Sequence, residues 1–232
     1  EAEHFSGCLI CGAPITYRAE SSIQTCSICH KEQLTNAVCE NSHFICDACH
    51  SYGTYAPVIA ALRDSTEKDA LLLLEKMMEQ PFCHMHGPEH HAIVPCVLLT
   101  AFRNNGEHMN YDAALSEICK RAKQVPGGTC GYWGVCGAAA GAGIFMSVMT
   151  GSSPLHKDTW PFPQKLVSII LSRLADVGGP RCCKRTSRIA IEEAVHFYSQ
   201  FCSVNIPSSS ITCKYCEDNR ECIQEDCPYY PE

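Results

Sequence analysis

The spacing of the cysteines constrains this chain more than any other feature. Of its 232 residues, 19 are cysteines. A gap of two residues lets both thiolates of a pair bind one metal ion in a tight turn. Four pairs have this gap: Cys8/Cys11, Cys26/Cys29, Cys46/Cys49 and Cys213/Cys216. The sequence therefore predicts a protein with several metal sites.

The charge and composition limit the class of protein. A net charge of −7 argues against a general binder of nucleic acids or membrane surfaces, and a hydrophobic share of 46% can form a core. The longest weakly polar run, residues 137–150, is too short to span a bilayer. We see no signal-peptide pattern, and the cysteine count is odd, so we expect a reducing cytoplasm rather than a disulfide framework. So many thiols suit a cell that meets little oxygen. The oligomeric state is left open.

Three regions differ in composition. Residues 1–52 hold closely spaced cysteines, residues 53–207 are helical in pattern, and residues 208–232 form a cysteine-rich tail after the polar break at 207–210. Alternating strand patterns are nearly absent from the middle region. We expect a mainly α fold, in which a helical core is flanked by an N-terminal double zinc-knuckle or ribbon module and a metal-binding tail.

Proline, glycine and capping residues set the expected helices. Thr66 is the expected N-cap of a helix that ends before Pro81, and Pro95 is expected to kink the helix that follows. A short apolar turn is expected at 57–62. Helices are expected after Thr66 and at 89–102, 111–123, 137–149, 164–177 and 181–201.

The N-terminal module offers enough ligands for two four-coordinate zinc ions. The pairs can combine in sequence, or crosswise, the first with the third and the second with the fourth. His43 is the least certain ligand, since His30 or His50 could replace it. The ions would replace a hydrophobic core that about fifty residues cannot build. The expected ligands are Cys8, Cys11, Cys26, Cys29, Cys39, His43, Cys46 and Cys49.

A histidine-rich segment begins the second helix of the core. Residues 83–91 contain four histidines, a cysteine and a glutamate. Imidazole suits zinc and iron, and a glutamate can act as a base or orient a ligand. We therefore expect His86, Glu89 and His90 to take part in catalysis.

Two further segments combine cysteines with glycines or basic residues. Glycines around Cys130 and Cys136 allow the backbone to approach a bulky inorganic group, and the N–H groups of the next helix can donate to it. The adjacent Cys182 and Cys183 point in different directions at a helix start, so that one can ligate while the other packs or reacts. The basic residues beside them could lower a thiol pKa or bind an anionic substrate: Arg181, Lys184 and Arg185.

The three core segments together resemble a known family. The motifs are HGPEHH at 86–91, CGYWGVCG at 130–137 and GPRCCKR at 179–185. They are similar to those of an uncharacterised cysteine-rich family of methanogens and anaerobic bacteria. The resemblance covers about residues 8–200 and implies an anaerobic, cytoplasmic setting without assigning an activity.

These residues favour an iron–sulfur enzyme. Cys130 and Cys136, with Cys182 or Cys183, could hold a cubane cluster, expected to be [4Fe–4S], with one open iron that acts as a Lewis acid. The expected reaction is non-redox sulfur removal or transfer, or a lyase step, on a small anionic substrate. Arg181 and Cys183 would contribute to catalysis beside the histidine-rich segment.

Two other functions remain open. The chain could be a non-catalytic adaptor or maturation factor that delivers metal, sulfur or a cluster to a partner metalloenzyme. It could also be a zinc hydrolase, because the order His-x-x-Glu-His at His86, Glu89 and His90 resembles that of inverzincins. Gly87 and Pro88, however, place the outer histidines across a helix start, so the two would not share one helical face.

The tail contains a fourth candidate metal site. The spacing of its four cysteines departs from the tight ferredoxin run, so zinc and an iron–sulfur cluster are both open. The expected ligands are Cys213, Cys216, Cys222 and Cys227.

Overall fold

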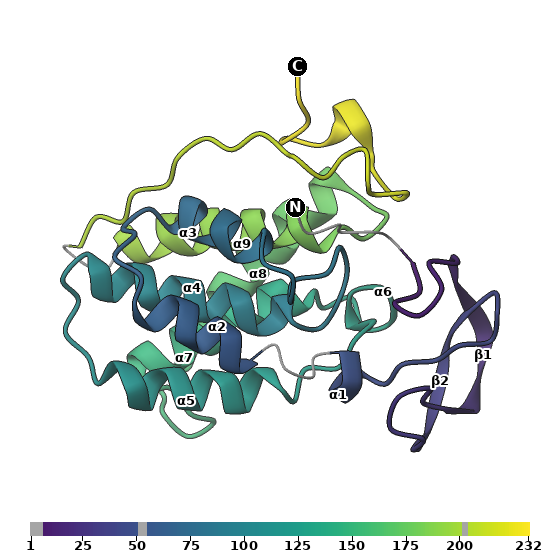
Figure 1. Ribbon diagram of the computed structural model, residues 1–232. Helices are drawn as coiled ribbons and strands as arrows, with labels where there is room; N and C mark the ends of the chain where they lie inside the picture. The colour runs from purple at the N-terminus through teal and green to yellow at the C-terminus, as the bar shows by residue number, and fades with distance from the viewer. Residues whose placement is uncertain (1–6, 51–54, 201–203) are drawn as a thin grey trace.

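The computed structural model describes residues 7–50, 55–200 and 204–232 and is mostly helical, with a two-stranded sheet at the N-terminal end (Figure 1). The expected mainly α architecture is confirmed at this level. The predicted domain boundary after residue 52 and the predicted end of the last helix at 201 lie outside the described residues. Among the helices described, none is long and apolar enough to cross a membrane.

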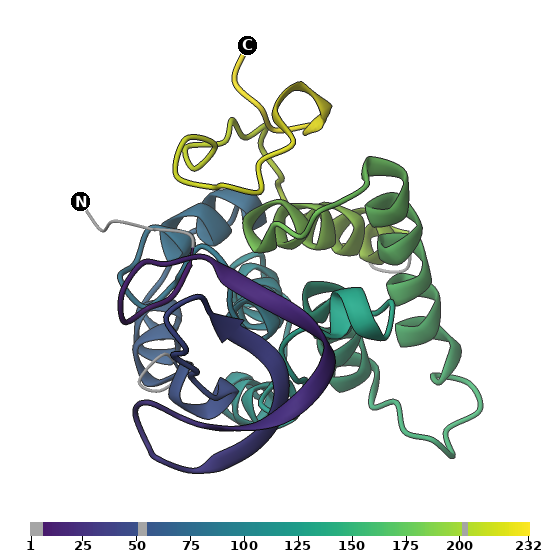
Figure 2. The same ribbon diagram turned by 90° about the vertical axis from the view of Figure 1, so that its right-hand side faces the viewer.

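The N-terminal module is built on a β-hairpin that the sequence analysis did not resolve. Strands β1 (Ile15–Thr25) and β2 (Glu32–Cys39) are antiparallel, and their register shifts between Tyr17 and Ser22. Most strand residues are exposed, so the strands carry little of the apolar alternation that reveals a half-buried strand. Figure 2 faces this hairpin and shows it in front of the helices. Helix α1 (Asp47–His50) ends the described part of the module.

Most helices of the helical domain occur where proline, glycine and capping residues predict them, but their first and last residues differ from those predicted. The helix after Thr66 begins later than predicted, because Asp69 rather than Thr66 is its N-cap and accepts hydrogen bonds from the backbone N–H of Leu71 and Leu72 at 2.9 and 3.0 Å. The helices are α2 (Tyr55–Arg63), α3 (Ala70–Met78), α4 (His90–Asn104), α5 (Tyr111–Ala122), α6 (Thr129–Tyr132), α7 (Gly137–Thr150), α8 (Pro161–Val177) and α9 (Cys183–Ser199).

Helix α4 is the centre of the helical domain. Every residue from His90 to Phe102 is buried, and the helix contacts α2, α3, α5, α7 and α9. A helix that is apolar on all sides belongs in the middle of a bundle. Helix α7 approaches it closely through small residues, since a Cβ at Gly141 would lie 2.6 Å from the carbonyl oxygen of His91.

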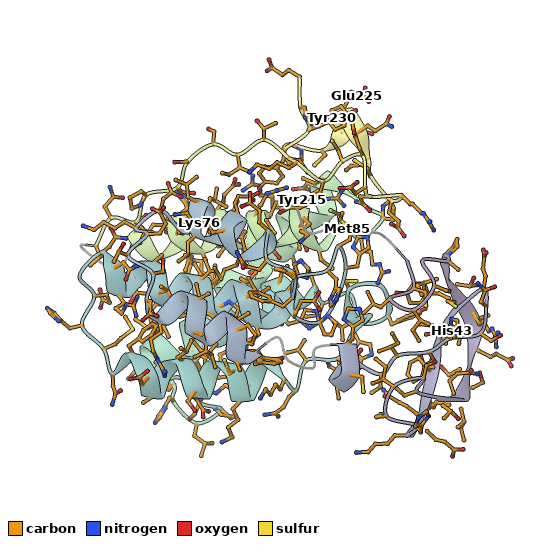
Figure 3. All side chains as sticks on the ribbon, in the orientation of Figure 1. His43, Lys76, Met85, Tyr215, Glu225 and Tyr230 are labelled. Atoms are coloured by element: carbon orange, nitrogen blue, oxygen red, sulfur yellow. The ribbon has the colours of Figure 1, made fainter. Side chains whose placement is uncertain are left out.

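The tail lies across α3 and α9 (Figure 1) and contains the 3₁₀ helix η1 (Gln224–Asp226). Ser209 donates a hydrogen bond to Asp69 at 2.7 Å, and Tyr215 is buried with its ring 4.6 Å from the ammonium of Lys184. In Figure 3 Tyr215 lies between the tail and the helices beneath it. The tail therefore covers buried charged groups of the helical domain.

Candidate functional site

Two groups of side chains in the N-terminal module could each hold a metal ion. The ligand atoms of Cys8, Cys11, Cys39 and His43 all lie within 4.8 Å of one another, and so do those of Cys26, Cys29, Cys46 and Cys49. The pairing is therefore crosswise, first with third and second with fourth. His43, which Figure 3 shows in the module, belongs to the first group.

The spacing within these groups fits a single tetrahedral ion. Zn–S bonds of about 2.3 Å give a tetrahedron with S···S edges of about 3.8 Å. The Sγ atoms of Cys11 and Cys39 are 3.8 Å apart, as are those of Cys29 and Cys46. Nδ1 of His43 lies 3.3, 3.5 and 3.8 Å from the three thiols of its group. A zinc tetrahedron with one nitrogen predicts S···N edges of about 3.6 Å.

Local hydrogen bonds favour the thiolate form of Cys11 in the first group. The backbone N–H of Ala13 is the main cause that lowers the pKa of Cys11 to about 6, and Asn41 donates to the same sulfur at 3.5 Å. A thiolate is the form that binds metal. The donor set, its spacing and this shift all fit a bound metal ion such as zinc.

The three core segments predicted to carry chemistry meet in one cavity. The cavity has a volume of about 880 Å³ and lies between the hairpin module and the helical domain. Tyr17 and Asn36 contribute from the hairpin, and Asn36 donates a 2.6 Å hydrogen bond to the hydroxyl of Tyr132 in α6. The predicted residues of the core segments that line the cavity are His86, His90, Cys130, Cys136, Arg181, Cys182, Cys183 and Arg185.

The cavity cysteines lie at helix starts. Cys136 is the N-cap of α7 and Cys182 the N-cap of α9, while Cys130 is exposed in α6. Burial raises the pKa of Cys183, a backbone hydrogen bond from Gly87 opposes the rise, and the Cys136 thiol adds to it. Cys182 instead interacts with Arg185 and Cys213, so the two adjacent cysteines do face different surroundings.

The basic segment is mostly buried, which corrects part of the predicted substrate site. The Lys184 ammonium is fully buried and donates to the carbonyl oxygens of Met78 and Cys83 at 3.1 and 3.2 Å, so Lys184 does not reach the cavity. Arg185 lines the cavity, but its guanidinium donates to the carbonyl oxygens of Gly178 and Pro180. Arg181 lies over the Tyr17 ring at 5.3 Å and has no carboxylate partner in the described part of the chain.

The histidine-rich segment is divided among several environments. Glu89 is fully buried and does not line the cavity, which corrects its predicted role as a base that reaches substrate. Nε2 of His90 lies 3.5 Å from the Cys83 thiol, and burial lowers the pKa of His90 to about 3. Nε2 of His86 lies 3.1 Å from Asn219 and 3.2 Å from Glu221, both in the tail.

A third group of metal-ligand type is not apparent from the sequence. It joins Glu89 to His50 and His84, whose ligand atoms lie within 4.8 Å of one another. His50 comes from the N-terminal module and had been considered only as a replacement for His43. The adjacency of His50 to Cys49 was a signal that the chain carries it toward a metal-binding region, but its partner could not be found without the fold.

The tail cysteines are not drawn together as a single-ion site requires. Cys213, Cys216, Cys222 and Cys227 are all described, and no three of their thiols lie within 4.8 Å of one another. The tail has little regular structure to hold them, and Cys213 instead contacts the Arg188 guanidinium. A cluster several ångströms across would tolerate wider spacing than one ion does.

Fold and side-chain clusters together define a mainly helical, cysteine-rich protein with groups that could hold metal ions. The chain belongs to the DUF5714 family, a family of unknown function, whose model matches residues 58–230. The matched region begins within α2 and contains the rest of the helical domain and nearly all of the tail. No match was found among curated proteins or among solved structures.

Proposed function

We propose that this protein is a metal-dependent enzyme of anaerobic metabolism that acts on a small anionic substrate in the cavity between the hairpin module and the helical domain. The observation that carries this proposal is the convergence of Cys130 and Cys136 from one segment and Cys183 from another on one cavity. Concave sites with a few converging polar groups are the usual location of active sites.

The cavity thiols suit an iron–sulfur cluster better than free nucleophiles. Burial raises the pKa of Cys136 and of Cys183, so both thiols stay protonated unless a cation displaces the proton. Backbone N–H groups of Ala138 and Ala139 donate toward Cys136, and such hydrogen bonds stabilise cluster-bound sulfur. The three thiols are not grouped as closely as one ion requires, and a cubane separates its ligands further.

When bound, a cluster with one open iron would supply a Lewis acid for non-redox sulfur removal or transfer, or for a lyase step. Arg181 would bind the substrate anion, because it reaches the cavity and has no carboxylate partner among the described residues. His86 also lines the cavity and would move the proton, with Asn219 and Glu221 of the tail fixing its ring.

The test is the iron and acid-labile sulfide content of protein purified without oxygen, together with its absorption spectrum. We expect about four irons and four sulfides per cluster. Cys136→Ala is expected to lose the cluster while the helical circular-dichroism signal remains. Cys216→Ala is the matched control in the tail and is expected to keep it. A colourless wild-type protein that contains zinc alone would rule the proposal out.

An adaptor that delivers metal or a cluster to a partner enzyme is the second candidate. Ile23 and Leu34 form a cross-strand pair on the hairpin, and each is 66% exposed. An apolar pair in water is typical of a contact surface. If cluster loss follows Cys216→Ala and not Cys136→Ala, the cluster belongs to the tail and this second function is favoured.

A further inference from the structure

We infer that His50, His84 and Glu89 form a third metal site, which binds one divalent transition-metal ion and leaves a coordination position open toward the cavity. Nδ1 of His50 lies 3.3 Å from Oε2 of Glu89, and Nδ1 of His84 lies 3.1 Å from Oε1. Metal–ligand bonds of about 2.1 Å predict ligand–ligand edges of about 3.4 Å in a tetrahedron and about 3.0 Å in an octahedron. The two observed distances, each to a different oxygen of the carboxylate, fall between these two values.

Two buried polar atoms of this group lack the hydrogen bonds that buried polar atoms normally form. Nδ1 of His50 and Oε2 of Glu89 are both buried, and neither has a hydrogen-bond partner among the residues that the structure describes. The two atoms face each other as an ion-pair contact at 3.3 Å. Unpaired polar atoms are costly in a protein interior. One cation between them would satisfy both atoms.

The absence of a side chain at residue 87 leaves room for these ligand atoms. A Cβ at Gly87 would lie 2.1 Å from Oε2 of Glu89 and 2.4 Å from Cε1 of His50. The backbone N–H of His84 also donates to Oε1 of Glu89 at 3.0 Å and fixes the carboxylate. On the other side, Asp47 of α1 accepts a 2.7 Å hydrogen bond from the N–H of Gly127, so that α1 is held against the helical domain. The ligands are therefore positioned by backbone on both sides.

The number of ligands separates this group from the other two. The two groups in the hairpin module have four ligands each, which is the closed arrangement of structural zinc. The third group has three, two imidazoles and a carboxylate, and His50 and His84 both line the cavity. Two histidines and one carboxylate are a donor set that zinc and ferrous iron share, with positions left for water or substrate. The open position would therefore accept an oxygen or sulfur atom of whatever the cavity binds.

The test compares zinc content among full-length variants loaded with zinc and dialysed. His84→Ala is expected to retain one ion fewer per chain than the wild type, because two remaining ligands bind zinc weakly. The His84 side chain is 28% exposed, so the fold tolerates its removal. Glu89→Gln has the same shape as the wild type and should show the same loss. His86→Ala removes a cavity histidine outside the group and is expected to keep the wild-type zinc content.

Equal zinc content in wild type and folded His84→Ala would overturn the inference, as would an equal loss in all three variants. Far-UV circular dichroism establishes that each variant is folded. The iron and sulfide content tests the proposed cluster separately, because none of these three residues is a cysteine. The third site and the cluster can therefore fail independently.

Discussion

Residue 87 has no room for a side chain, because the glycine packs directly against a buried carboxylate. Glu89 is fully buried and its carboxylate is held by His84, so it cannot move aside. Burial would raise the pKa of Glu89, but close contacts with His50 and His84 lower it well below its usual range. The carboxylate is therefore charged and fixed.

Gly87→Ala is expected to lower the free energy of unfolding by about 1–3 kcal/mol, the usual effect of overpacking. The cause is the added Cβ, which would meet Glu89 and His50. Gly131→Ala is the matched control, because a Cβ there meets nothing within 4 Å, and its effect should stay within about 0.5 kcal/mol. Chemical denaturation measures both. Equal effects of the two variants would contradict the described packing.

Charged residues show where single-residue prediction fails. The sequence predicts that Lys184 and Arg185 bind an anionic substrate, yet both are buried, and so is Arg188 one turn further along α9. Arg188 forms a bidentate ion pair with Glu75 at 2.7 and 2.9 Å, between α9 and α3. Its partner is more than a hundred residues away in the chain, so no local pattern reveals it.

Glu75→Gln is expected to cost about 3–5 kcal/mol of unfolding free energy, because it leaves the Arg188 charge buried without its counter-ion. Glu79→Gln removes an exposed carboxylate paired with Lys214 and should cost at most about 0.5 kcal/mol. Comparing the two variants separates the effect of losing a carboxylate from a buried ion pair from the effect of losing one from an exposed ion pair. A cost near zero for Glu75→Gln in a denaturation experiment would refute the buried pair.

Among the elements, the sequence of the hairpin module predicts the candidate metal ligands but not which pairs of ligands come together in one group. The two-residue gaps predict that Cys8 and Cys11, or Cys26 and Cys29, lie in one turn, since this depends on local geometry alone. Which of the metal-binding turns lie close together depends on the register of β1 and β2. Because most residues of these strands are exposed, the sequence shows almost no strand pattern from which the register could be predicted. The choice of His43 over His50 depends on the same register.

Double variants test the crosswise pairing directly. Cys8→Ser with Cys39→Ser removes two ligands of one group and is expected to lose one zinc per chain. Cys8→Ser with Cys26→Ser removes one ligand from each group and is expected to lose two. Sequential pairing predicts the opposite order. Zinc measured by mass spectrometry of the purified variants decides between them.

In the whole molecule, the helical domain and the hairpin module have separate cores. The large cluster of buried apolar residues begins at Val58, whereas the module buries a small cluster of Cys26, Val38, Phe44 and Cys46. The helical core was predictable from apolar patterns and helix punctuation. The cavity was not, because it forms where three loops and the hairpin meet.

Removing metal with a strong chelator is therefore expected to unfold the hairpin module and to leave most of the helical signal. A module whose own apolar cluster is this small depends on its ions for folding. Limited proteolysis should cut within residues 7–50 before it cuts the helices, and added zinc should restore protection. A cooperative loss of far-UV circular dichroism at the first chelator step would show that the two parts fold as one.

The crosswise pairing also sets an order of events during synthesis. While the chain leaves the ribosome, the turns that begin at Cys8 and Cys26 emerge first, and each carries only two of the four ligands of its group. His43 completes one group and Cys49 the other, only a few residues apart, and His50 follows directly. Both groups would thus be complete almost together, before the first residue of α2 has appeared. We expect the supply of metal in the cell to act on the nascent chain at that moment.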